Sequence, residues 1–279
     1  MQTGRASRTA FRVAQRRAIH QILDRPPVLN DPIAIPLLGS EFTCDAEQES
    51  TRFARAFRAF MVARSRLAED HLAEAVAQGL TQYVVLGAGL DTFAYRNPFA
   101  LIRVFEVDFP ATQKWKRSLL SAAQIPVPAN LTFVPLDFEH MTLAEGLAAA
   151  RFDFAQPAFF GWLGVVPYLS LPAFRSTIET IGQMPIGSGV CFDFAQPPET
   201  LQPEFLRAFQ ALAARVAAAG EPFRLFFTPA QLEEELRAAG FTRVEILTPG
   251  EINDRYFSNR SDRLGMPRAG VGMFATAWK

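Results

Sequence analysis

One stretch of the chain joins a short apolar run to a glycine turn and then to residues that can begin a helix. The apolar run is Tyr-Val-Val-Leu at residues 83–86, and residues 87–92 read Gly-Ala-Gly-Leu-Asp-Thr. The run predicts a buried strand, and the capping pair after the glycines predicts the start of a helix. In an open α/β sheet such a turn lies at the carboxyl end of a strand, where ligands bind and where glycine allows close approach.

A second apolar stretch follows about twenty residues later and ends in an acid. It reads Val-Phe-Glu-Val-Asp and ends at Asp108. An acid at the tip of the second strand can accept hydrogen bonds from both hydroxyls of a ribose. Asp108 and the glycine turn together therefore indicate a nucleoside site. The alternative is that the two glycines only form a turn, because a short motif alone is weak evidence.

The charge of the turn indicates which nucleoside to expect. Dinucleotide folds carry Gly-x-Gly-x-x-Gly, so that a pyrophosphate can lie against a bare helix N-terminus. Here Thr92 stands where the third glycine would be, and the carboxylate of Asp91 lies near the position of the phosphates. S-adenosylmethionine has an adenine and a ribose but no phosphate, and its sulfonium is cationic. We therefore expect this cofactor in place of a dinucleotide.

The composition bounds the fold and the partners. The chain has 279 residues, 49% of them hydrophobic, which is enough for a large core in one elaborated domain. Basic and acidic residues number 28 each, so no overall field attracts nucleic acid or an anionic membrane. We expect a small-molecule acceptor and neither of those partners, while the oligomeric state stays open.

The cysteines and the apolar runs indicate a cytoplasmic protein without a metal. Cys44 and Cys191 are far apart and have no neighbouring His/Cys cluster, which predicts neither a disulfide framework nor a zinc site. No apolar run reaches about 18 residues, and the start lacks the apolar stretch of a signal peptide. The three histidines form no arrangement typical of a catalytic triad or a metal site.

Two helical segments precede the glycine turn. Residues 1–30 interleave arginines with apolar residues, which predicts a helix whose basic face is solvated or, alternatively, forms a lid that attracts an acidic substrate. Residues 49–78 predict a second helix whose apolar stripe contains Arg64, whereas Arg58 and the other arginines fall outside it. A buried guanidinium needs a carboxylate, so Arg64 holds either the methionine carboxylate of a cofactor or an internal acid.

Further apolar runs predict the remaining elements. We expect strands at residues 102–107, 131–136, 157–163, 188–194, 242–247 and 270–278, and helices at residues 111–123, 171–183, 199–219 and 228–240. The sheet then has about seven strands, and the last can pair antiparallel to its neighbour. Lys116 is expected at the surface of its helix. Asp137 and Phe138 end the third strand and can offer an acceptor and a flat wall to an adenine, although Asp137 can equally cap a helix or a turn.

Three ordered motifs resemble those of the leucine carboxyl methyltransferase family. They lie at residues 85–92, 105–110 and 133–138, and the resemblance extends over nearly the whole chain. It implies an α/β, Rossmann-like class I methyltransferase with an about seven-stranded, mostly parallel sheet, helices on both faces and an N-terminal helical extension. We expect a single domain with a helical cap over residues 1–79, a core over residues 80–279 and a helical insertion near residues 199–239. The family also implies that the N-terminal segment lies over the active site.

The resemblance also implies individual site residues. The cofactor ligands would be Arg64, Gly87, Ala88, Gly89, Asp108, Asp137, Phe138 and Leu163. Family members usually have Trp-Glu-Gly-Val where this chain has Trp-Leu-Gly-Val at residues 162–165, so Leu163 replaces a cofactor-contacting glutamate. Tyr168 follows where the family's tyrosine lines the reaction centre, although a tyrosine beside a proline can simply be packing.

These observations favour an S-adenosylmethionine-dependent O-methyltransferase acting on a carboxylate or hydroxyl of a small molecule. A carboxylate is ionised at neutral pH and needs no general base, and we identify no base in the sequence. Because of Leu163, the alternative is a protein that binds the cofactor but no longer transfers methyl groups. A nicotinamide-dependent oxidoreductase is the third class considered.

Overall fold

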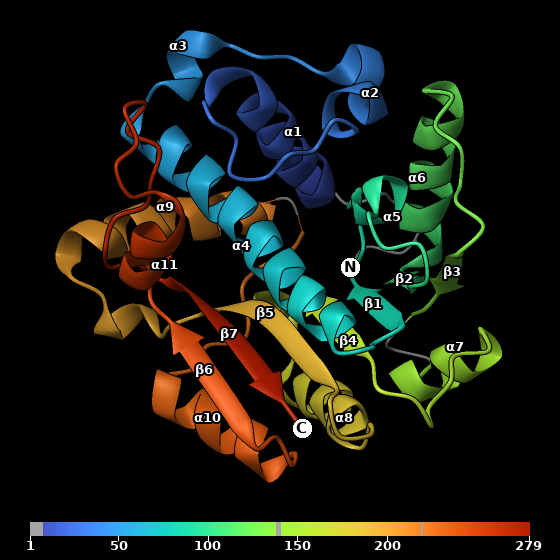
Figure 1. Ribbon diagram of the computed structural model, residues 1–279. Coiled ribbons are helices and arrows are strands. Elements are labelled where there is room, and N and C mark those ends of the chain that lie inside the picture. The colour runs from blue at the N-terminus through green and yellow to red at the C-terminus, as the bar shows by residue number, and fades with distance from the viewer. Residues whose placement is uncertain (1–7, 138–140, 219) are drawn as a thin grey trace.

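The computed structural model describes residues 8–137, 141–218 and 220–279, and its centre is one seven-stranded sheet (Figure 1). The strand order is β3-β2-β1-β4-β5-β7-β6. All neighbouring strands are parallel except β7, which pairs antiparallel with both β5 and β6. The strands are β1 (Gln82–Leu86), β2 (Arg103–Asp108), β3 (Leu131–Pro135), β4 (Phe159–Trp162), β5 (Gly189–Ala195), β6 (Arg243–Leu247) and β7 (Gly272–Trp278).

This topology confirms the predicted α/β class and the antiparallel final strand. The order reverses between β1 and β4, because the chain first builds outward through β2 and β3 and then returns to the other side of β1. In sheets of this kind, ligands bind beyond the carboxyl ends of the strands at such a reversal. The glycine turn follows β1 at this point.

One face of the sheet is covered by α4 (Arg52–Ala77), α5 (Phe93–Arg96) and α11 (Pro249–Tyr256). The long helix α4 crosses the front of the sheet in Figure 1. Its apolar stripe packs on alternate residues of the strands, such as Tyr83, Val85 and Phe159. The helix after the glycine turn is short, because Asn97 and Pro98 follow it and a residue before proline avoids helical geometry.

The opposite face is covered by α7 (Leu143–Ala149), α8 (Leu171–Gly182) and α10 (Pro229–Ala238). Here the other set of alternating strand residues forms the core, and it is rich in large aromatic side chains. Trp162 stacks on Phe174 at 5.6 Å between ring centroids. Helix α10 begins with the expected Thr228 cap, in which Thr228 and Gln231 form a reciprocal capping box.

The remaining elements flank the sheet or join these layers. Helix α1 (Arg8–Leu23) packs against α2 (Ala34–Leu38), α4 and the buried Leu90 of the glycine-turn segment. Helix α6 (Pro110–Ala122) follows β2. The others are η1 (Gly39–Glu41), α3 (Ala46–Glu49), η2 (Val166–Tyr168), η3 (Pro198–Thr200) and α9 (Pro203–Ala218). Figure 1 shows α1 and α2 together above α4, at the top of the view.

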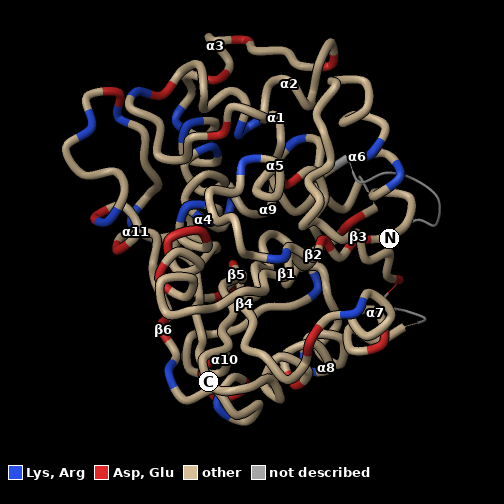
Figure 2. The backbone as a smooth tube through the Cα atoms, turned by 45° about the vertical axis from the view of Figure 1, so that its right-hand side comes forward, with Lys and Arg blue, Asp and Glu red and all other residues tan. Residues whose placement is uncertain are grey.

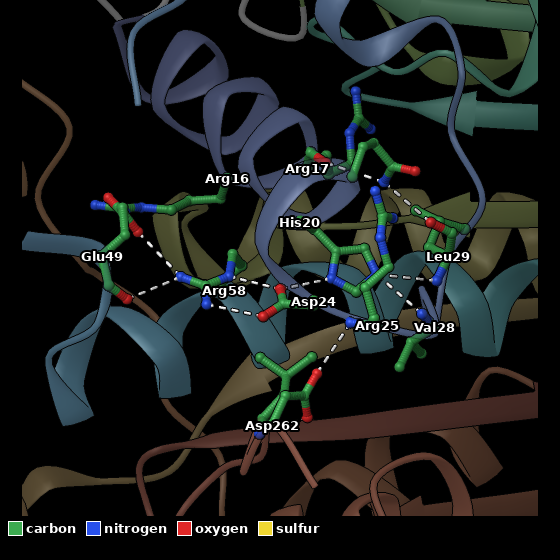
Figure 3. A network of polar contacts seen from close by, with 12 residues as sticks. Arg16, Arg17, His20, Asp24, Arg25, Val28, Leu29, Glu49, Arg58 and Asp262 are labelled. Carbon is green, nitrogen blue, oxygen red and sulfur yellow. Dashed lines mark hydrogen bonds and ion pairs between the residues drawn. The ribbon is translucent and has the colours of Figure 1, made fainter. Parts of the chain in front are cut away.

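A buried network of charges joins α1 to α4 (Figure 3). The Arg58 guanidinium donates to both oxygens of Asp24, at 2.7 and 2.9 Å, and to Glu49 at 3.1 Å. The Nε2 atom of His20 accepts from two backbone N–H groups, so its Nδ1 carries the proton that is shared with Asp24. Burial raises the pKa of Asp24, but the hydrogen bonds from His20 and Arg58 outweigh this effect and lower it.

Two sequence-based expectations of surface charge are therefore wrong. Arg58 is only 2% exposed, because Asp24, directly after α1, and Glu49 of α3 meet it outside the apolar stripe. Lys116 is 1% exposed and forms an ion pair at 2.7 Å with Glu106 of β2, which is equally buried. Burial raises the pKa of Glu106 to about 7, against the opposing effect of Lys116. Neither partner could be located from helical spacing alone.

Across the described residues, every helix is too short or too polar to cross a lipid bilayer.

The network around Arg58 provides a test of how the N-terminal helices are held. We expect Arg58→Ala to lower the free energy of unfolding by about 3 to 5 kcal/mol, because it leaves two carboxylates buried without their partner. The measurement is urea denaturation at neutral pH. The control is Arg207→Ala on α9, where the side chain is exposed and lines neither pocket, and a change within about 0.5 kcal/mol is expected. Equal losses in both variants would contradict this account.

Candidate functional site

The glycine turn after β1 is fastened to the end of β2. The backbone N–H groups of Gly87 and Ala88 donate to the carbonyl oxygen of Val107 at 2.8 and 3.0 Å. The N–H of Gly89 donates to the Asp108 carboxylate. The first strand and the acid of the second strand are therefore joined at the point where the chain enters the site.

These hydrogen bonds decide which ligands the turn can hold. A pyrophosphate site needs free N–H groups in the turn, but three successive groups already have partners in β2. Gly87 and Gly89 have positive φ angles of 65° and 47°. A Cβ atom on Gly87 would lie 2.4 Å from Val165, so the turn has room only for glycine there.

Asp108 lies at the carboxyl end of β2 and is 7% exposed. Besides Gly89, the backbone N–H of Phe109 donates to this carboxylate at 2.6 Å. Burial raises the pKa of Asp108, and these hydrogen bonds oppose the rise. A carboxylate has about four acceptor positions. Thr112 also interacts with this carboxylate, so up to two positions stay available for the hydroxyl groups of a ligand such as a ribose.

A cavity of about 590 Å³ opens beyond the carboxyl ends of β1, β2 and β4. Its size is within the range of small-molecule and cofactor sites. The cavity brings together eight of the nine site residues expected from the sequence: Arg64, Gly87, Ala88, Gly89, Asp108, Asp137, Leu163 and Tyr168. The ninth, Phe138, lies outside the described residues, as does His140.

Arg64 reaches the cavity from α4, where an internal acid partly holds it. Its Nη1 atom lies 3.3 Å from Oδ2 of Asp193 at the end of β5. The other oxygen of Asp193 accepts from the N–H of Gly164 at 2.6 Å. The guanidinium packs directly on Gly164, since a Cβ atom there would lie 2.6 Å from Nη1. The structure shows the internal acid, and because Arg64 also lines the cavity, its contact with a cofactor carboxylate stays a prediction.

Helix α1 forms the roof of the cavity. Ala10, Val13 and Ala14 line it, and the buried Arg17 follows on the same face. The guanidinium of Arg17 donates to the carbonyl oxygen of Leu90 and, at 3.1 Å, to Asp91. Arg17 is therefore not part of the solvated basic face expected for this helix, because its side chain is buried. Arg12 is exposed, as expected.

Asp91 is consequently not a free charge beside the turn. Burial raises its pKa, but Arg17 and other nearby cations outweigh this effect and lower it. Asp91 also accepts from the N–H of Phe93, the first residue of α5, at 2.8 Å. A pyrophosphate is therefore disfavoured mainly because the N–H groups of the turn already donate to β2. The charge of Asp91 contributes less, since Arg17 pairs with it.

A chain of buried charges continues from Arg17 to α4. Asp31 lies 3.6 Å from Arg17 and 3.5 Å from Arg96, and it accepts from the Thr92 hydroxyl at 2.6 Å. Arg96 in turn forms a bidentate pair with Glu69 of α4. The roof, the turn and α4 are therefore held by one network of ion pairs.

The outer end of the cavity, which we define by Tyr168 and Arg224, carries a phenol and a guanidinium group. Tyr168 packs on Phe223 at 5.2 Å between ring centroids, and burial raises the pKa of its phenol. The tyrosine is therefore neutral near pH 7 and can donate a hydrogen bond. Arg224 also lines this end, and its exposed guanidinium has no ion pair among the described residues.

Sequence reasoning missed Arg17, Gly164, Asp193 and Arg224 as parts of the site. Asp193 carried a signal, because it is an acid between two phenylalanines in a run that predicts a buried strand. Arg17 and Arg224 carried none, because each depends on how distant segments fold over the sheet. The described residues hold no group of three or more His, Cys, Asp or Glu side chains that could bind a metal ion.

The close contact between Gly164 and Arg64 can be tested by stability. We expect Gly164→Ala to lower the free energy of unfolding by about 1 to 3 kcal/mol more than Gly79→Ala, because the added methyl group displaces Arg64 from Asp193. Gly79 is the matched control, since it also has a positive φ but a Cβ atom there meets nothing within 4 Å. The measurement is urea denaturation of both variants. Equal losses would mean that the contact with Arg64 is not tight.

The chain is similar to known proteins in sequence and in fold. YktD of Bacillus subtilis (strain 168), named as a proposed S-adenosyl-L-methionine-dependent methyltransferase, is 31% identical over 95% of both chains. A protein of Mycobacteroides abscessus with the same kind of name is 32% identical over 70% of this chain and 66% of its own.

Solved structures show the same fold at lower sequence identity. A protein of Thermobifida fusca YX, described as a proposed methyltransferase, has a TM-score of 0.56 and 20% identity over 88% of this chain and 92% of its own. A duf574 family protein of Streptomyces avermitilis MA-4680 has a TM-score of 0.55 and 18% identity over 88% and 94% of the two chains.

The sequence profile of the leucine carboxyl methyltransferase family matches residues 10–182. The chain therefore belongs to the leucine carboxyl methyltransferase family.

Proposed function

We propose that this S-adenosylmethionine-dependent methyltransferase transfers its methyl group to a carboxylate oxygen of a small acidic molecule. The observation that carries the proposal is the chemistry of the outer end of the cavity. Arg224 offers a cation without an internal partner among the described residues, and Tyr168 offers a hydrogen-bond donor. No histidine is among the described residues that line the cavity, and a carboxylate acceptor, which is ionised at neutral pH, needs no general base.

We infer the orientation of the cofactor from the residues that line the cavity. Asp108 would accept hydrogen bonds from the ribose hydroxyls, and Asp137 would accept one from the exocyclic amine of the adenine. Gly87 and Gly89 line the cavity, so a ligand can approach the backbone of the turn. Arg64 keeps N–H groups beyond the one directed at Asp193, and these would meet the methionine carboxylate.

The reaction needs alignment more than acid-base chemistry. The cofactor supplies an electrophilic methyl carbon on a cationic sulfur. A carboxylate oxygen forms a bond to that carbon while the carbon–sulfur bond breaks, and the electron pair of that bond stays on sulfur. Placing acceptor, methyl group and sulfur in line can supply much of the rate enhancement in such a step. Because burial raises the pKa of Tyr168, this side chain would orient the acceptor as a donor and would not remove a proton.

A second candidate function is cofactor binding without methyl transfer. It rests on Leu163, which lines the cavity where the family usually has a glutamate. Asp108, Asp137 and Glu221 also line the cavity, so another acid could compensate for the missing glutamate. A nicotinamide-dependent oxidoreductase is not favoured, because the N–H groups that would hold a pyrophosphate already donate to β2.

The two candidates differ in product formation. We expect the protein to convert S-adenosylmethionine to S-adenosylhomocysteine with at least one member of a panel of small carboxylic acids. Turnover should be faster with acids than with phenols or alcohols, which need a base. The measurement is the accumulation of S-adenosylhomocysteine against a reaction without acceptor. Cofactor binding without turnover across acids, phenols and alcohols would favour the second candidate.

The role of Asp108 can be measured without knowing the acceptor. We expect Asp108→Ala to weaken S-adenosylhomocysteine binding by about 1 to 3 kcal/mol, the usual effect of losing hydrogen bonds to a charged group. Isothermal titration calorimetry gives the dissociation constant. Asp254→Ala is the control, because Asp254 is exposed and pairs only with Arg268 at the surface. Unchanged affinity in Asp108→Ala would assign the ribose to another acid.

The role of Arg224 requires a substrate from the acid panel. We expect Arg224→Ala to lower kcat/KM for that acid about tenfold through a higher KM, because a charge-assisted hydrogen bond to the acceptor is lost. The dissociation constant of S-adenosylhomocysteine should stay the same. Arg207→Ala, an exposed arginine of α9 that does not line the cavity, is the control. An unchanged KM in Arg224→Ala would remove Arg224 from the acceptor site.

A further inference from the structure

We propose that a second site, formed by Arg52, Arg55 and Arg263, binds a small phosphate-bearing anion. A pocket of about 280 Å³ lies between the start of α4 and the segment at residues 263–267, which follows α11. The three arginines line it, together with Ala56 and small or apolar residues of that segment. No acidic residue is among the described residues that line the pocket.

The three guanidinium groups have no partner within the described protein. None of them forms an ion pair or a side-chain hydrogen bond with another described residue. Their neighbours differ in this respect, because Arg260 pairs with Asp262 and Arg268 pairs with Asp254. Arg55 is half-buried, so its charge is partly removed from water without a compensating carboxylate. An anion in the pocket would supply the missing partner for all three.

The start of α4 adds to the positive potential. The helix is 26 residues long, begins at Arg52 and has no acidic residue in its first turn. The amino end of a helix carries a partial positive charge, so cations there are unfavourable and anions are favoured. Arg52 and Arg55 both lie in this first turn. The repulsion between these cations and the positive end of the helix destabilises the ligand-free protein. A bound anion would reduce this repulsion. In Figure 2 many of the Lys and Arg positions gather around α1 and α4.

The segment that carries Arg263 is firmly held. The Asn253 side chain donates to the carbonyl oxygen of Met266 at 2.6 Å and accepts from its N–H at 2.9 Å. Asp262 accepts from the backbone N–H groups of Leu264 and Arg25, both at 3.1 Å. Figure 3 shows the contact between Asp262 and Arg25. Arg263 is therefore presented from a fixed backbone, which lowers the entropy lost on binding.

The pocket is separate from the cofactor cavity. The two share no lining residue. Arg64, which lines the cofactor cavity, is twelve positions after Arg52 on the same straight run of helix, a rise of about 18 Å at 1.5 Å per residue. An anion held at the start of α4 would therefore lie well away from the methyl-transfer site. The proposal does not depend on the acceptor proposed above.

The chemistry of the pocket favours phosphate over a single carboxylate. Guanidinium groups bind phosphate oxygens in a bidentate manner, and a tetrahedral phosphate presents oxygens in three directions at once. A carboxylate has only two oxygens in one plane and can match fewer of the three arginines. We therefore expect the ligand to carry one or two phosphate groups.

The experiment uses inorganic pyrophosphate as the probe and isothermal titration calorimetry of the full chain at low ionic strength. We expect binding that is weakened about tenfold or more by Arg55→Ala and by Arg263→Ala, through the loss of a charge-assisted pair. Binding should persist when the protein is saturated with S-adenosylhomocysteine. Arg215→Ala, which removes an exposed arginine of α9 that also lacks a described partner, should leave the affinity unchanged.

Several results would overturn the proposal. One is the absence of pyrophosphate binding to the unaltered protein, and another is an equal loss in Arg215→Ala, which would indicate a nonspecific effect of charge. Displacement of pyrophosphate by S-adenosylhomocysteine would place it in the cofactor cavity, and tighter binding of citrate would contradict the preference for phosphate. The affinity of each variant for S-adenosylhomocysteine shows whether it is folded, so a folding defect is not read as loss of the anion site.

Discussion

The attachment of the glycine turn to the end of β2 is the constraint on which the rest of the site depends. Gly87, Ala88 and Gly89 all donate their N–H groups to β2, and Asp108 takes one of them. This places the acid beside the turn and, at the same time, removes the donors that a pyrophosphate would need. A turn that is short of donors, next to a carboxylate with acceptor positions to spare, suits a nucleoside that carries no phosphate.

Buried ion pairs then hold the walls of the cavity around this turn. Arg17 fastens the roof to Leu90 and Asp91, while Asp31 and Arg96 extend the network towards α4. Arg64 is held by Asp193 across Gly164. Buried pairs of this kind add little net stability, but removing one partner is costly, so they fix one geometry of the walls.

Much of the fold and part of the site could be predicted because their signals are local. The strands are short apolar runs, the turn is marked by Gly87 and Gly89, and Asp108 follows its strand directly. The burial of Arg58, Lys116 and Arg17 could not be predicted, because each is set by a carboxylate from another segment or by how α1 packs. The lone arginines that surround the second pocket look like surface charges in the sequence, and only the fold brings Arg263 to the start of α4.

The most direct measurement of the central claim is a crystal structure of the protein with S-adenosylhomocysteine. The account predicts that both ribose hydroxyls donate to Asp108 while the N–H groups of Gly87 and Ala88 still donate to Val107. The adenine should lie beside Asp137 and the amino-acid end beside Arg64. A ligand bound elsewhere, or a turn that releases β2 and directs its N–H groups at the ligand, would contradict it.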